Sequence, residues 1–224
     1  MRLQAVDGQP IPNLPRGWQS SLLNNIARFK SGGTPSKEVA AYWGGPHPWV
    51  SPKDVKAEVL KDSQDHISDL AISNGYELLP LDTIIAVVRS GILAHTIPLA
   101  FTAAPLAINQ DIRAIIVDKA VCSPRYLFRY LQSLEQIILK TGVKRGATVH
   151  SMRSNYLETI KIVYPEDLNE QERIADDLDA RLRLANELQQ VLKEQMKYAK
   201  ALPTSILQSL VPNIKSVLPT KVRD

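Results

Sequence analysis

The sequence has 224 residues, 44% of them hydrophobic and 22% charged, with one cysteine, four histidines and a formal net charge of +4. A single cysteine excludes an internal disulfide framework, and the four scattered histidines beside it argue against a zinc cluster. The first residues lack the apolar core of a signal peptide, and no apolar run approaches the length of a membrane-spanning helix, so we expect a cytoplasmic protein.

Short apolar runs broken by Gly, Pro, Asn and Asp fill the first part of the chain. We expect an extended lead-in over residues 1–17, a turn over Lys30–Ser36 and an irregular loop over Tyr42–Trp49, because Gly and Pro favour turns. The β-branched runs 83–88 and 111–117 predict buried strands.

A helix is predicted from Ser123 and Pro124, because Ser is a favourable N-cap and Pro suits the first helical position. The apolar residues of one helical face should pack on the sheet: Leu127, Tyr130, Leu131, Leu134 and Ile138. The run Ile160–Val163 predicts a last short strand.

From Asn169 to about Ala201 the chain has neither Gly nor Pro, and apolar residues recur three or four positions apart. This spacing predicts an amphipathic helix, capped by Asn169 with Glu172 three residues on, and ended or kinked by Pro203 at about Leu202. Such a helix is roughly 50 Å long, which suggests a spacer or a dimerisation device. Its apolar stripe comprises Ile174, Leu178, Leu182, Ala185, Leu188, Leu192, Ala199 and Leu202.

Common enzyme signatures are missing from the sequence. It has no glycine-rich phosphate loop, no G-x-S-x-G elbow, no [DN]-P-P-[YF] element for amino-methyl transfer and no Pro-Asp followed by Glu-x-Lys. The charge distribution is more informative, because the segment between Glu135 and Glu158 has no acidic residue and carries four basic ones: Lys140, Lys144, Arg145 and Arg153. Such a segment favours a polyanionic partner.

Several segments, in order along about residues 14–210, resemble the specificity subunit of type I restriction-modification systems. The matching elements are Leu14–Trp18, Ser31–Ser36, Tyr42–Gly45, Pro48–Asp54, Val88–Gly91, Ala107–Asp111, Gly146–Thr148 and Asn169–Ile174. The resemblance implies a DNA-binding target recognition domain over 1–165, a conserved long helix over 166–211 and a tail over 212–224. The chain departs from the family at Val163–Asn169, where members usually have a Pro-Pro pair.

A full specificity subunit carries two recognition domains and two long helices that pack antiparallel, whereas this chain has one of each. It therefore resembles a half-subunit or a fragment of a longer subunit. We expect an α+β fold: a globular target recognition domain followed by a long C-terminal helix that pairs as an antiparallel coiled coil in a homodimer.

The resemblance further implies a non-catalytic subunit that recognises a bipartite, inverted-repeat target in double-stranded DNA. Its expected partners are a DNA adenine methyltransferase (modification) subunit and a restriction translocase. S-adenosylmethionine, ATP and Mg²⁺ are expected on those partners, with no cofactor or metal on this chain. A coiled-coil assembly adaptor, and the recognition domain of a fused methyltransferase-nuclease without its catalytic half, stay open as alternatives.

The loop Lys144–His150 is the first candidate for DNA contact. Lys144 and Arg145 would hold phosphates or read guanine, while Thr148 and His150 would touch base edges. A solvated surface loop is the alternative. Arg153 follows in the same basic segment and is included in the expected set.

Other candidates lie at strand ends and turns. Arg89 and Ser90 follow a buried strand, so Arg89 would project into the DNA groove or form an ion pair. Four further polar residues suit phosphate binding or simple turn chemistry: Lys30, Ser31, Thr34 and Lys53. Trp43 and Trp49 are expected to anchor the core, and the amides of Asn109–Asp111 suit adenine but are expected to brace a turn.

Overall fold

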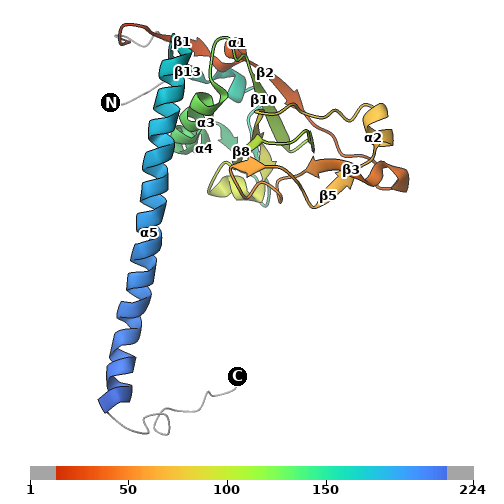
Figure 1. Ribbon diagram of the computed structural model, residues 1–224. Helices are drawn as coiled ribbons and strands as arrows, with labels where there is room; N and C mark the ends of the chain where they lie inside the picture. Colours follow the sequence, from red (N-terminus) through yellow and green to blue (C-terminus); the bar gives the residue numbers. More distant parts are fainter. Residues whose placement is uncertain (1–13, 211–224) are drawn as a thin grey trace. The chain divides into compact units, whose positions relative to one another are not determined.

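The structure is a computed structural model that describes residues 14–210, so most of the expected lead-in and the tail 212–224 lie outside the described residues. The chain divides into two units, the first ending at Ala175 and the second beginning at Asp176. The first is a mixed α+β unit rich in sheet, and the described part of the second is helical (Figure 1). The first unit therefore extends past residue 165, where the sequence placed its boundary.

A five-stranded sheet forms the centre of the first unit. Its strands, in spatial order, are β2 (Ala27–Ser31), β10 (Ile112–Val117), β6 (Ile84–Val87), β8 (Leu99–Thr102) and β4 (Val59–Leu60). The runs predicted as strands over 83–88 and 111–117 are confirmed as β6 and β10, which pair antiparallel. All four residues of β6 are buried, as expected for a β-branched strand at the middle of a sheet.

Three smaller sheets surround the central one. They are β1 (Trp18–Leu22) with β13 (Lys161–Pro165), then β5 (Asp65–Ile67) with β3 (Trp43–Val50) and β9 (Ala107–Ile108), and finally β11 (Val143–Lys144) with β12 (His150–Met152) and β7 (Arg89–Ser90). The predicted strand Ile160–Val163 is confirmed as β13. Short helical segments connect these strands: α1 (Leu23–Ile26), α2 (Asp69–Ser73), η1 (Ala40–Tyr42), η2 (Gly91–Ala94) and η3 (Leu157–Thr159).

The loop predicted over Tyr42–Trp49 is wrong, because most of it is strand β3. The register against β5 shifts between Trp43 and His47, a bulge that spans Gly44, whose φ is +75°. β3 pairs with β9 only at its last two residues. The prolines therefore lie where β3 has one neighbouring strand, which is where a strand tolerates a missing N–H. The turn predicted over Lys30–Ser36 is also shorter than expected, because β2 extends to Ser31.

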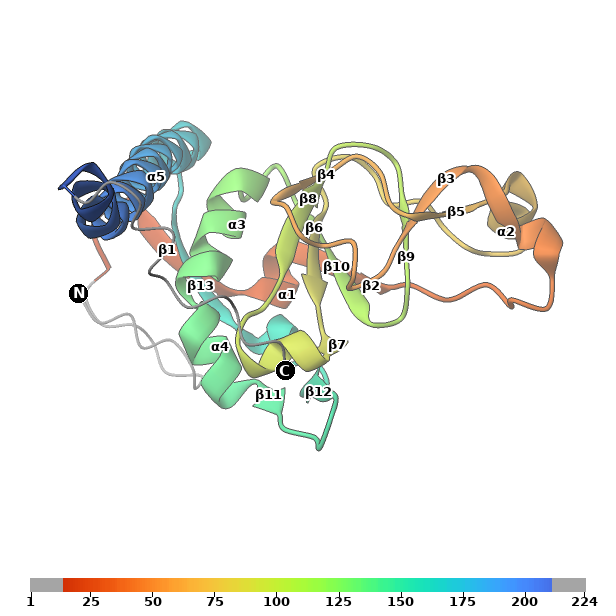
Figure 2. The ribbon, with the colours of Figure 1, turned by 90° about the horizontal axis from the view of Figure 1, so that it is seen from below.

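The helix predicted at Pro124 is confirmed as α3 (Pro124–Ser133), and the Ser123 side chain caps it by accepting from the backbone N–H of Tyr126. Its expected apolar face is buried, but the helix breaks at Leu134 and α4 (Glu135–Thr141) follows. Both helices lie on one face of the central sheet (Figure 2). The tilted pair of Phe101 on β8 and Phe128 on α3, with ring centroids 4.4 Å apart, is part of this packing.

The predicted long helix is confirmed as α5 (Leu168–Leu210), but it begins before the predicted cap at Asn169. The cap is Asp167, whose carboxylate accepts from the backbone N–H of Asn169 at 2.9 Å. The helix continues past Pro203, so the proline does not end it at Leu202. The alternative, a kink at Pro203, stays a prediction, because proline removes one intrahelical hydrogen bond. None of the described helices is long and apolar enough to cross a membrane.

The first turns of α5 are fixed to the first unit by Gln171, which is fully buried. Its Nε2 donates to the carbonyl of Pro165 at 2.8 Å and to that of Val121 at 3.2 Å, and its Oε1 accepts from the N–H of Ser123 at 2.7 Å. Glu172 accepts from the hydroxyl of Ser123 at 2.5 Å and does not form a capping box. Residues Asn169–Ile174 thus connect the start of α5 to the end of β13 and to the residues before α3.

Candidate nucleic-acid interface

The sheet of β7, β11 and β12 brings together most of the predicted DNA-contacting residues. Ser90 pairs with His150, and Arg89 and Lys144 each pair with Ser151, from opposite sides of β12. Two segments about 60 residues apart in the chain thus form one surface, which we call the cationic hairpin sheet. It consists of β7, β11, β12 and the connecting residues 145–149 (Figure 2).

The connection between β11 and β12 is exposed from Arg145 to Val149. The N–H of Gly146 donates to Nδ1 of His150 at 3.2 Å, which leaves Nε2 as the donor of the imidazole. A Cβ on Gly91 would lie 3.3 Å from the carbonyl oxygen of Thr148, so the connection passes close to the start of η2. These contacts orient the loop against β7.

The basic side chains of this surface are not paired with acidic side chains in the described part of the chain. Among the described residues, no ion pair involves four exposed cations of this region: Arg89, Lys144, Arg145 and Arg153. Arg153 joins the region through its N–H, which donates to the carbonyl of Gly142 at 2.7 Å. Unpaired cations in a segment without acids produce a local positive potential that attracts phosphate.

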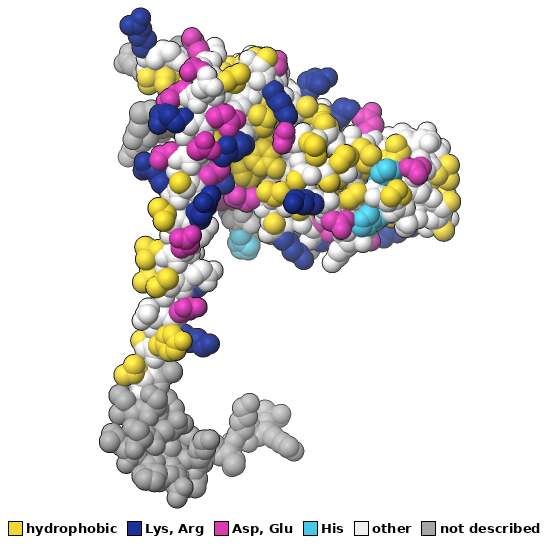
Figure 3. Space-filling model, in the orientation of Figure 1, with side chains coloured by type: hydrophobic (Ala, Val, Ile, Leu, Met, Phe, Trp, Pro, Cys, Tyr) yellow, Lys and Arg dark blue, Asp and Glu magenta, His cyan; other side chains and the backbone are white. Residues whose placement is uncertain are grey.

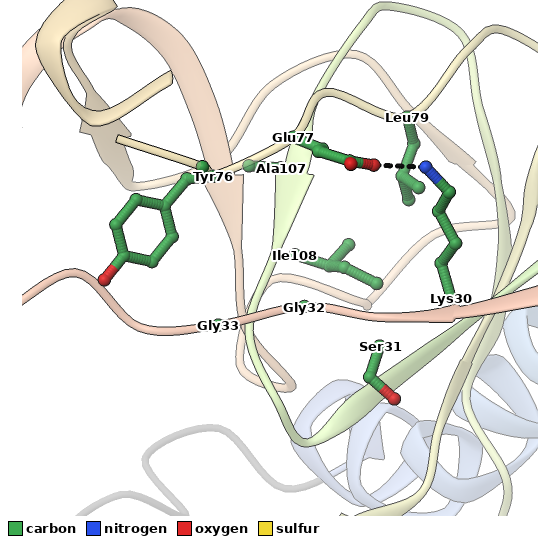
Figure 4. Close-up of a pocket in the computed structure, with 10 residues that line it drawn as sticks. Lys30, Ser31, Gly32, Gly33, Tyr76, Glu77, Leu79, Ala107 and Ile108 are labelled. Atoms are coloured by element: carbon green, nitrogen blue, oxygen red, sulfur yellow. Dashed lines mark hydrogen bonds and ion pairs between the residues drawn. The ribbon is translucent and has the colours of Figure 1, made fainter. Parts of the chain in front are cut away.

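Lys30 lies elsewhere and is neutralised. Its amine forms an ion pair with Glu77 across a cleft of about 420 Å³ that is lined by the backbone of Gly32, Gly33 and Ile108. Figure 4 shows Lys30 and Glu77 pointing toward each other, while Ser31 points to the other side of β2. Its carboxylate partner makes Lys30 a weaker candidate for phosphate than the cations of the hairpin sheet.

The remaining predicted residues are also engaged. The hydroxyl of Ser31 accepts from Arg113 at 2.7 Å. Arg113 is a half-buried cation that the sequence interpretation missed, although it is the one charge in the apolar run of β10, and it pairs with Glu158 at 3.9 Å. Lys53 donates to Asp65 at 2.8 Å, and this hydrogen bond raises the pKa of Lys53. The hydroxyl of Thr34 donates to Oε1 of Gln110 at 2.6 Å.

The turn Asn109–Asp111 is braced as predicted. The buried Asn109 donates from Nδ2 to the carboxylate of Asp111 at 3.2 Å and accepts from its N–H at 3.0 Å. The expected anchoring by tryptophan is also confirmed: Trp49 is buried, donates from Nε1 to the carbonyl of Gly33 at 2.9 Å, and packs edge-on against Trp43.

The apolar stripe of α5 begins later than predicted. Ile174 packs against the core of the first unit, so the exposed stripe starts at Leu178. The large apolar side chains beyond it are between 38% (Leu178) and 67% (Tyr198) exposed: Leu178, Leu182, Leu184, Leu188, Val191, Leu192, Met196, Tyr198 and Leu202 (Figure 3). Apolar exposure on this scale is typical of surfaces that bind another chain.

The exposed apolar residues of α5 form two rows. The first row is Leu178, Leu182, Leu192 and Met196, and the second is Leu184, Val191 and Tyr198, which the prediction missed. By helical spacing, Leu188 and Leu202 of the predicted stripe lie closer to the second row than to the first. At 3.6 residues per turn the second row lies about 140° around the helix from the line of Leu178 and Met196. One coiled-coil seam covers a narrower arc than this.

No group of His, Cys, Asp and Glu side chains within the described part of the chain is arranged to hold a metal ion. The cationic hairpin sheet presents exposed cations, hydroxyls and an imidazole on a short sheet. Such groups make hydrogen bonds to phosphate oxygens and to base edges.

Residues 15–198 match the protein family described as the type I restriction modification DNA specificity domain. The chain is 34% identical over 177 residues to the type I restriction enzyme EcoR124I/EcoR124II specificity subunit of Escherichia coli, and 27% identical over 191 residues to the type I restriction enzyme MjaIX specificity subunit of Methanocaldococcus jannaschii. These matches cover 78% and 80% of this chain but 43% and 42% of the relatives. The chain thus spans less than half the length of the curated relatives it matches.

Solved structures have the same fold. A chain from a structure concerned with complex assembly and conformational transition of the type I R-M system has a TM-score of 0.70 at 20% identity, and covers 89% of this chain and 47% of that one. The HsdS subunit from Thermoanaerobacter tengcongensis gives 0.65 at 18% identity, with 89% and 46% covered. At these identities the likeness shows the fold, which confirms the α+β class with a long C-terminal helix.

Proposed function

This chain belongs to the family of type I restriction-modification DNA specificity domains, and we propose that it recognises a specific sequence in double-stranded DNA without catalysing a reaction itself. One observation supports DNA binding above the rest: three cations of the cationic hairpin sheet (Arg89, Lys144 and Arg145) and the neighbouring Arg153 lie together, and none of them forms an ion pair within the described residues. Lys144 and Arg145 would contact phosphates, and Ser90, Thr148 and His150 would approach base edges.

We further propose that two copies pair through α5. Burial of a Leu side chain contributes about 1.5–3 kcal/mol, so the row of Leu178, Leu182, Leu192 and Met196 favours a two-fold dimer strongly. An antiparallel pair presents two identical recognition units in opposite senses. The target would then be an inverted repeat, with two short half-sites separated by a fixed spacer.

The second row, Leu184, Val191 and Tyr198, would remain exposed in such a dimer, and we propose that the DNA adenine methyltransferase (modification) subunit covers it. S-adenosylmethionine would be bound by that subunit, and ATP and Mg²⁺ by a restriction translocase. In the cell this arrangement requires all partners in the cytoplasm with the DNA.

Binding to duplex DNA at increasing salt concentration tests the proposed recognition. We expect the affinity to fall with salt, and Lys144→Ala with Arg145→Ala to lower the salt slope by about one unit for each lost phosphate contact. Lys119→Ala is the matched control, because this exposed amine is paired with Asp82 at 2.7 Å near the opposite end of β10 from Arg89. Salt-independent binding, or a slope that responds equally to Lys119→Ala, contradicts the proposal and favours a protein-binding adaptor.

Light scattering tests the two rows of α5. Leu182→Asp with Leu192→Asp should dissociate the dimer, because burial of unpaired carboxylates is costly. Leu184→Asp with Val191→Asp should leave the dimer intact and abolish binding of the modification subunit. A wild-type chain that stays monomeric, alone and with the modification subunit, contradicts pairing through α5.

A further inference from the structure

The exit of β2 and the turn between β9 and β10 lie against each other. A Cβ on Gly32 would lie 1.7 Å from the carbonyl oxygen of Ile108, so only glycine permits this approach. The N–H of Gly33 donates to the same carbonyl at 3.0 Å. Thr34 follows directly after this contact. Its hydroxyl donates to Oε1 of Gln110 at 2.6 Å, although the two residues are 76 positions apart in the chain.

Gln110 stands on a rigid turn. Its preceding neighbour, Asn109, is buried, donates its N–H to the carbonyl of Val50 at 2.9 Å, and braces Asp111 from its side chain. Gln110 itself is exposed, and within the described residues its side chain has the single hydrogen bond to Thr34. The bracing of the turn is therefore done by Asn109 and Asp111, and the hydrogen bond from Thr34 orients the exposed amide of Gln110.

This turn adjoins the cationic hairpin sheet. The carbonyl of Asp111 accepts from the N–H of Val88 at 2.8 Å and from that of Arg89 at 3.2 Å. Gln110 is thus the neighbour of Asp111, whose carbonyl binds the start of β7 (Figure 2). β7 consists of Arg89 and Ser90. A duplex held by the cations of the sheet would have Gln110 beside it.

The hydrogen-bonding capacity that remains on Gln110 matches one base. An amide has two donors on nitrogen and two lone pairs on oxygen, and Thr34 occupies one of the lone pairs. One acceptor and two donors remain, and the acceptor with one of the donors is enough to pair with the N6 donor and the N7 acceptor of adenine in the major groove. We propose that Gln110 reads an adenine in each half-site and that Thr34 is its positioning residue. This inference rests on the proposed function.

Selection from duplexes with randomised base pairs, followed by measurement of Kd on single-position variants, tests the inference with the full chain. We expect wild type to prefer A·T at one position in each half-site, and Gln110→Ala to reduce that preference roughly 5- to 150-fold while other positions keep theirs. Thr34→Val should weaken the preference at the same position, and Thr34→Ser should restore it. Gln136→Ala, an exposed glutamine on α4, should change nothing.

The possible results separate this inference from the proposed function. If Gln110→Ala weakens binding equally for all base pairs at every position, Gln110 contacts phosphate and the inference is overturned. An unchanged preference for A·T also overturns the inference. A preference lost at a G·C position overturns the choice of adenine. Absence of salt-dependent duplex binding by wild type overturns the proposed function and this inference together. Thermal unfolding of each variant, expected within a few degrees of wild type, confirms that the fold is intact.

Discussion

Replacement of Gln171 by Leu should destabilise the first unit severely. The side chain is fully buried and makes three hydrogen bonds to backbone groups of Val121, Ser123 and Pro165. Leu has a similar volume, so the change removes polar partners with little effect on packing. A buried polar group that loses its partner costs about 1–3 kcal/mol. Leu cannot accept from the N–H of Ser123, which is then left without a partner, whereas the carbonyls of Val121 and Pro165 lose a donor at a smaller cost. We therefore expect a loss of roughly 2–5 kcal/mol in the free energy of unfolding.

Urea denaturation followed by tryptophan fluorescence measures this loss. All three tryptophans, Trp18, Trp43 and Trp49, lie in the first unit, so the signal reports that unit. Protein concentration is held constant, because dimerisation shifts apparent stability. Gln190→Leu is the matched control: it is an exposed glutamine of α5 on the side opposite the apolar rows, and its effect should stay within about 0.5 kcal/mol. A Gln171→Leu chain that matches this control would refute the assigned role of the hydrogen bonds.

Three further predictions concern the core, the backbone and catalysis. Burial raises the pKa of Cys122 to about 12, so the native thiol should resist alkylation at pH 8 and react fully in urea. Because the thiol of the unfolded chain ionises at lower pH, the free energy of unfolding should fall as pH rises from about 9 to 12, by up to about 1.4 kcal/mol per pH unit. Cys122→Ala should remove that part of the pH dependence. Gly32→Ala should cost about 3 kcal/mol in urea denaturation because its Cβ meets backbone, whereas Gly33→Ala, which meets only the edge of the Tyr76 ring at 3.3 Å, should cost far less. The isolated chain should transfer no methyl group from labelled S-adenosylmethionine to DNA, and transfer above background would show that it holds a catalytic site.

The amino-acid sequence alone determined the features that depend on neighbouring residues. The β-branched runs became β6 and β10, Ser123 and Pro124 began a helix, and the periodic apolar residues after residue 169 became α5. These signals are local, because strand burial, helix capping and helical periodicity act over a few positions. The basic segment around Lys144 and Arg145 was visible for the same reason.

Only the tertiary structure decided which distant segments meet. Lys30 pairs with Glu77, which is 47 residues away in the chain, and Thr34 donates to Gln110. The sequence does not indicate a partner for either side chain. Ile174 fits the helical stripe yet packs on the core, because the buried Gln171 fixes the first turns of α5 there. β7 joins the basic hairpin through pairing across about 60 residues. Chain closure of this kind depends on the packing of the whole unit, which no local pattern encodes.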